Sequence, residues 1–140
     1  MPANIDPIFS RLGKFGSARV TAANTSSAGG GTIGTDIFLA FTADATNGSF
    51  ISMVRWIPIA TTPTNTTATV GRVFFSTKTS GATTNADTWL IAELPLPLVA
   101  ADNASAAVLW YDIPIMRILP PGYTILVTNH AAPAANTNWL

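Results

Sequence analysis

The chain has 140 residues, of which 48% are hydrophobic and 10% are charged, with seven bases balanced by seven acids. A typical soluble domain is about a quarter charged, so this chain is short of groups that perform acid–base chemistry, hold metals or bind nucleic acid through a basic face. One histidine and no cysteine exclude a disulfide scaffold and a thiolate metal site. The length suits a single domain.

The formal net charge of zero predicts association. Charge keeps proteins apart in solution, and its absence in an apolar chain favours an oligomer or a subunit docked on something larger. The first residues (MPANIDP) lack the basic start and apolar run of a signal peptide. The most apolar stretch, residues 89–101, is interrupted by Glu93, Pro95 and Pro97 and is too short to span a bilayer. We therefore expect synthesis in a cytoplasm.

Residues 1–17 are expected to form an irregular arm ahead of a domain at residues 18–140. Prolines and glycines interrupt this arm, although residues 7–14 could form one and a half turns of amphipathic helix. The arm carries a set of apolar residues that are candidates for docking on a larger partner or a sister subunit. These residues are Ile5, Ile8, Phe9, Leu12 and Phe15.

Beyond the arm, runs of strand-forming residues alternate with turn clusters. A weak run at 18–23 precedes a Ser/Gly-rich loop at 24–31. The first clear run, residues 36–42, leads to a turn that contains Asn-Gly at 47–48, a pair that tolerates positive φ. Residues 49–60 (SFISMVRWIPIA) are apolar on both faces, as expected where one sheet packs on another sheet or on a neighbouring subunit.

Four more strand-like runs follow, separated by polar loops at 61–67 and 79–87 and by a Pro-Pro-Gly turn. Pro95 and Pro97 cannot donate to a ladder, so the end of their run must lie at an edge or leave the sheet. The runs are residues 68–77, 88–98, 107–118 and 123–129, and a tail of small residues follows at 131–140.

The spacing of these runs, roughly 10–18 residues, suits an antiparallel sandwich. A parallel α/β fold would need a helical segment between strands, and the sequence contains no such segment. We predict a single-domain, all-β antiparallel β-sandwich that is jelly-roll-like, with an immunoglobulin-like sandwich as the alternative.

The sequence predicts no catalytic, cofactor-binding or metal site, and hence no enzyme. His130 follows a strand-like run without a nucleophile elbow. The chain has no histidine pair, and the segment 44–48 has one carboxylate and is typical of a turn. The glycines at 29–31 lack the lysine of a phosphate loop.

Four charges within strand-like runs need partners, because an unpaired buried charge costs several kcal/mol. We expect cross-strand ion pairs that fix register, joining Arg55 or Arg72 to Glu93 or Asp112. Nothing places the two acids in one cleft, as glycoside hydrolysis would require.

The tryptophans favour a packing role over a sugar-binding platform. Trp56, Trp89 and Trp110 lie among aliphatic residues, where core or interface packing is the expected use.

Three segments resemble small virion proteins of tailed bacteriophages, of the capsid cement or decoration type. In that group a polar turn leads to two Arg-bearing strands, an acid-containing strand and a P-x-G-Y turn. The matching segments are residues 42–75, LIAELP at 90–95 and LPPGYT at 119–124, within a resemblance that covers residues 36–130.

The resemblance implies a structural protein that stabilises a phage head as a homotrimer bound to the major capsid protein. It implies a location on the capsid surface of the virion, after synthesis in the cytoplasm of the host bacterium. Nucleic acid, membrane and small-molecule substrates are not expected partners. Tail and fibre proteins share such folds, so a phage tail or fibre protein, or a carbohydrate (receptor)-binding module, is the alternative.

Overall fold

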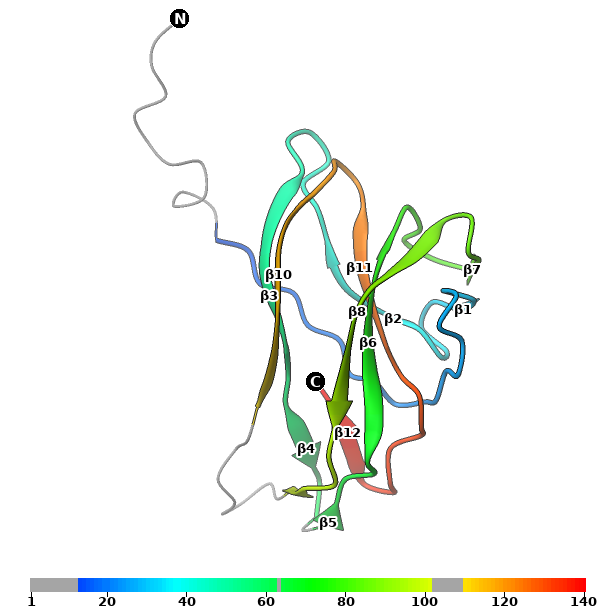
Figure 1. Cartoon of the computed structure of the whole chain (residues 1–140), viewed down its shortest axis with the longest axis vertical. Helices are drawn as coiled ribbons and strands as arrows, with labels where there is room; N and C mark the ends of the chain where they lie inside the picture. The colour runs from blue at the N-terminus through cyan, green and yellow to red at the C-terminus, as the bar shows by residue number, and fades with distance from the viewer. Residues whose placement is uncertain (1–12, 63, 102–109) are drawn as a thin grey trace, which may run out of the picture.

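The computed structural model describes residues 13–62, 64–101 and 110–140 of the chain. In these residues the secondary structure is all β, with no helix, and the strands pair in several antiparallel sheets. Two layers face each other across an apolar core, an arrangement that is consistent with a β-sandwich (Figure 1). The predicted all-β class is confirmed.

The first layer is a four-stranded sheet with the order β2-β11-β6-β8. All six residues of its inner strand β11 are buried. Such complete burial requires cover on both faces of the sheet, and it explains the continuous run of apolar and threonine residues in this strand. The strands are β2 (Phe38–Thr42), β11 (Thr124–Asn129), β6 (Thr69–Ser76) and β8 (Thr88–Leu96).

The second layer is built on residues 49–60, which the sequence predicted as one strand and the structure divides into β3 (Ser49–Trp56) and β4 (Pro58–Ala60). β3 pairs with β10 (Tyr111–Leu119), whereas β4 pairs with β12 (Thr137–Trp139). The exchange of partners occurs at Ile57, whose N–H donates to the carbonyl of Leu140 and whose carbonyl accepts from the N–H of Leu140. Pro58 has no N–H to continue the ladder.

Several short strands lie outside the strand-like runs that the sequence predicted. They comprise two or three residues each, too few to carry an alternating pattern, so contacts distant in sequence set their positions. The weak run at 18–23 contributes isolated bridges through Val20 and Ala23. The short strands are β12, in the predicted tail, and β1 (Gly31–Thr32), β5 (Thr64–Asn65), β7 (Ala82–Thr83) and β9 (Ala100–Ala101).

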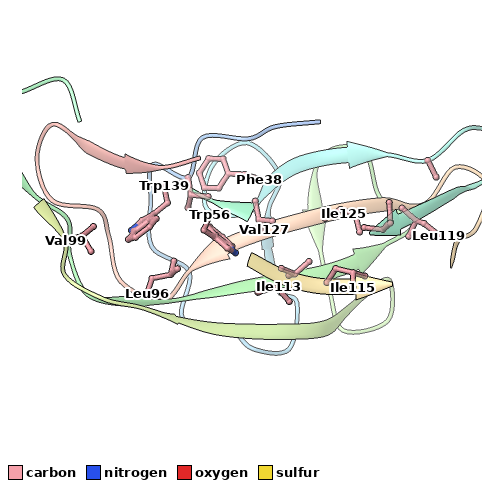
Figure 2. Close-up of a cluster of buried hydrophobic side chains, with 14 residues drawn as sticks. Phe38, Trp56, Leu96, Val99, Ile113, Ile115, Leu119, Ile125, Val127 and Trp139 are labelled. Carbon is pink, nitrogen blue, oxygen red and sulfur yellow. The ribbon is translucent and has the colours of Figure 1, made fainter. Parts of the chain in front are cut away.

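The core between the layers contains two buried tryptophans, Trp56 and Trp139. Figure 2 shows their indoles among aliphatic side chains from both layers. A second, smaller cluster lies on the other face of the four-stranded sheet, where Leu126 and Phe74 pack with Ile37. Residues 24–37 therefore cover the face that the second layer does not.

Gly71 is required by the packing of Trp56. A Cβ at this position would lie 2.9 Å from Trp56 Cε2 and 3.0 Å from Leu96 Cδ1, both on buried side chains. We predict that Gly71→Ala lowers the free energy of unfolding by about 1–3 kcal/mol through overpacking, measured by urea denaturation. Gly13→Ala is the control, because an added Cβ there meets nothing within 4 Å. Equal stability of the two variants would contradict the prediction.

Candidate functional site

The first of two arginine–carboxylate pairs lies on the second layer, where Arg55 and Asp112 are directly opposite each other on β3 and β10. Two hydrogen bonds join them, from Nε to Oδ1 at 2.7 Å and from Nη2 to Oδ2 at 2.8 Å. These bonds hold the pKa of the Asp112 carboxyl below its ordinary value. The guanidinium also lies over the ring of Trp110, 5.1 Å from its centroid. Both members are exposed, so the pair fixes cross-strand register more than it adds stability.

The second pair lies on the four-stranded sheet, where Arg72 of β6 faces Glu93 of β8. Arg72 Nε donates to Glu93 Oε1 at 2.6 Å. The guanidinium also donates from Nη1 to the backbone carbonyl of Asn24 at 3.1 Å, and its Nη2 lies 3.2 Å from His130 Nδ1. Because arginine has no acceptor, Nδ1 of His130 must accept this hydrogen bond. We call these four residues the Arg72 cluster.

The Arg72 cluster holds the 24–31 loop against the sheet. The backbone N–H of Asn24 donates to the carbonyl of Asn129 at 2.7 Å. Its side chain accepts from the N–H of Ser26 at 2.8 Å and donates to the carbonyl of Gly30 at 3.0 Å. The loop is thus folded on Asn24 and attached through Arg72, which is 7% exposed. In this arrangement Nδ1 of His130 faces the guanidinium of Arg72 and not a nucleophile.

The structure resolves which acid belongs to which base, a question that the sequence left open. It places Glu93 and Asp112 on different layers, each bound to its own arginine. The roles of Asn24 and His130 were missed, because neither residue belongs to a recognisable pattern. Within the described ranges, no cluster of three or more His, Asp or Glu residues could hold a metal ion. The same ranges contain no helix long and apolar enough to cross a membrane.

An apolar surface covers the outer side of the second layer, and we call it the β3–β10 outer face. Two cross-strand pairs build it, Phe50 opposite Ile118 and Met53 opposite Pro114. Ile118 is 71% exposed, and Met116 beside it is 65% exposed. Single exposed apolar residues are ordinary, but a contiguous group of them indicates an interaction surface.

The backbone of this face is strained at Met116. Its φ is +49°, in the left-handed region that a methionine rarely adopts, and the pairing of β10 with β3 shifts register between Pro114 and Arg117. A bulge of this kind redirects a side chain, and the strain costs on the order of 1–3 kcal/mol. The fold therefore accepts a destabilising backbone conformation at Met116, an apolar residue that faces solvent.

A groove of about 1000 Å³ opens between β3, β2 and residues 13–18, and Phe50, Met53 and Ile118 of the β3–β10 outer face also line it. Ile125 and Val127 of β11 lie at its base. At one end Lys14 Nζ lies 3.4 Å from Asp44 Oδ2. Backbone N–H groups of Asn47 and Thr46, and then Lys14, hold the pKa of Asp44 below its ordinary value.

Of the five arm residues proposed for docking, Phe15 is described, and it is 91% exposed at the wall of the groove. Ile5, Ile8, Phe9 and Leu12 lie outside the described residues, as does the helical turn expected at residues 7–14, apart from its last two residues. Residues 13–17 have no regular secondary structure.

The tryptophans divide into two kinds. Trp56 and Trp139 are each 1% exposed, whereas Trp110 is 56% and Trp89 is 42% exposed. Trp89 stacks on Tyr123, with ring centroids 6.4 Å apart and planes inclined at 19°.

Comparisons of this chain with protein-family models, with curated proteins and with solved structures find no match.

The two arginines should differ in their contribution to stability. Arg72→Met removes the donor to the carbonyl of Asn24 and releases the loop, so we expect a loss of about 2–3 kcal/mol in the free energy of unfolding. Arg55→Met should cost much less, because water replaces the exposed bonds. Urea denaturation of both variants checks the difference, and a larger loss for Arg55→Met would contradict it.

Proposed function

We propose that this chain is a structural, non-enzymatic subunit of a bacteriophage virion, of the capsid cement or decoration type. In this proposal it acts as a homotrimer that binds the major capsid protein across capsomers on the virion surface. The observation that carries the proposal is the β3–β10 outer face, an exposed apolar surface on a chain with few charges. The sequence resemblance supplies the viral context.

The order of the strands supports the jelly-roll-like form of the fold. In an immunoglobulin-like sandwich the first two strands share a sheet, as do the last two. Here β2 and β3 belong to different layers, and so do β10 and β11. The chain crosses between layers after β2, after β4, after β8, after β10 and after β11, as expected of a jelly roll.

The composition of the β3–β10 outer face suits a buried interface. Its two methionines, Met53 and Met116, and the aromatic ring of Phe50 are of the types enriched at interface centres, where charged residues are depleted. Arg55 and Asp112 neutralise each other through two hydrogen bonds, and Arg117 is a further exposed charge on β10 between Met116 and Ile118. A standard interface buries about 800 Å² on each partner, and a trimer multiplies weak contacts through effective concentration.

One observation favours the second candidate, a tail, fibre or carbohydrate (receptor)-binding module. Trp89 and Tyr123 are nearly parallel, and Trp89 is exposed. Such rings offer a flat apolar surface of the kind that packs against a sugar. Glycan-array binding that Trp89→Ala abolishes would support this candidate, and its absence would remove it.

The test of the first candidate is binding to capsids assembled from the major capsid protein of the same phage. We expect the wild-type chain to be trimeric by light scattering and to occupy the capsid surface. Met116→Asp should weaken occupancy at least tenfold, because a carboxylate would enter an apolar contact. Leu98→Asp is the control, because Leu98 is 58% exposed but lies between β8 and β9, outside the β3–β10 outer face. A monomeric chain, or equal occupancy by both variants, would refute the proposal.

A further inference from the structure

The groove between β2 and β3 is an opening into the interlayer core. Its base is formed by Ile125 and Val127, which are 2% and 4% exposed and face the same core as Trp56. Ala40 and Phe41 of β2 line one wall, and residues 51–54 of β3 line the other. The lining is therefore mainly apolar, and its base consists of residues that belong to the interlayer core.

Both walls are sheet edges. Among the described strands, β2 pairs with β11 alone and β3 pairs with β10 alone. The edge of a strand is a template for another extended chain, because its backbone groups can form a new ladder. On the β2 side, Gly16 already lies against Ala40 and Phe41. The groove therefore combines apolar contacts with the edge of β3 as the backbone template for an added segment.

Residues 1–12 have the length and composition of an occupant. They precede Gly13, which lines the groove, and they carry Ile5, Ile8, Phe9 and Leu12. Twelve extended residues span about 40 Å, more than the roughly 27 Å of a strand of eight residues such as β3.

The course of residues 13–18 favours a neighbouring copy as the source of this segment. They already occupy one side of the groove, and the ion pair of Lys14 with Asp44 fixes their start at one end of it. A chain filling its own groove would have to reverse direction at once. In Figure 1 the first described residues, in blue, lie beside β3 at the margin of the molecule.

We propose that the groove between β2 and β3 binds residues 1–12 of a second copy of this chain. Exchange of arms buries apolar residues of both copies against the walls of the groove. This inference concerns contacts between copies, so it does not depend on the viral function proposed above, and a failure of capsid binding would leave it intact.

Disulfide trapping tests the location directly, since the full-length chain has no cysteine. One set of chains carries Ile5→Cys, Ile8→Cys or Phe9→Cys, and a second chain with a mass tag carries Ser52→Cys, an exposed position in the groove wall. We expect at least one mixture to form a disulfide-linked heterodimer under mild oxidation. Ser80→Cys, exposed and away from the groove, is the matched control partner.

Three results would overturn the proposal. The first is no heterodimer with Ser52→Cys in any mixture, and the second is equal trapping with Ser80→Cys. The third is an intramolecular disulfide in a chain carrying both an arm cysteine and Ser52→Cys, with no crosslink between separate chains, since this would place each arm in its own groove.

Complementation provides a second measurement on full-length chains. An arm variant, Phe9→Asp, keeps its groove, and a groove variant, Ser17→Glu with Ser52→Glu, keeps its arm. Each alone should associate at least tenfold more weakly than wild type, and an equimolar mixture should recover heteromeric association by light scattering. Thr79→Glu with Ser80→Glu is the control for the added charge, at exposed residues. Wild-type association by either single variant, or no recovery on mixing, would contradict arm exchange.

Discussion

The constraint on which the structure depends is the burial of the four-stranded sheet on both faces. Its strand β11 has no exposed residue, so each face needs a cover. The second layer supplies one cover and places Trp56 against Gly71, where no larger residue fits without displacement. Residues 24–37 supply the other, although they contain little regular structure. A loop that covers one face of a sheet must be attached to that sheet, and the Arg72 cluster provides the attachment.

The two arginine–carboxylate pairs show that burial changes how much the same kind of ion pair contributes to stability. Both join neighbouring strands, and both have a short bond from Nε. The guanidinium of Arg72 is buried and must satisfy its donors within the protein, so it binds a carboxylate, a carbonyl and an imidazole nitrogen. Arg55 can exchange its partners for water. Loss of Arg72 therefore leaves a buried carbonyl unpaired, whereas loss of Arg55 does not.

The long strands were predictable because their burial requires runs of apolar and β-branched residues, which are visible in the sequence. Residues 123–129 and 68–77 were expected as strands, and β11 and β6 lie within them. The split at Ile57 and the strand β12 were not predictable, because three residues such as Thr137–Trp139 become a strand through pairing with β4. The charges of the ion pairs could be identified in sequence, but their pairing required the register of the sheets. The groove has no sequence signal, since it arises where two edges lie side by side.

The pairing of strands far apart in the sequence has a consequence for synthesis. β2 requires β11, β3 requires β10, and β4 requires β12, so the partners of the first strands come from the last third of the chain. Of the long strands, β6 and β8 form the one hairpin between neighbours in sequence. Until residues beyond 110 leave the ribosome, this hairpin lacks β11 at one edge and has no β10 above the face that carries Val73. The core is therefore complete only after β10, β11 and β12 have been synthesised. Non-local pairing of this kind folds slowly and exposes apolar strands to aggregation in the meantime.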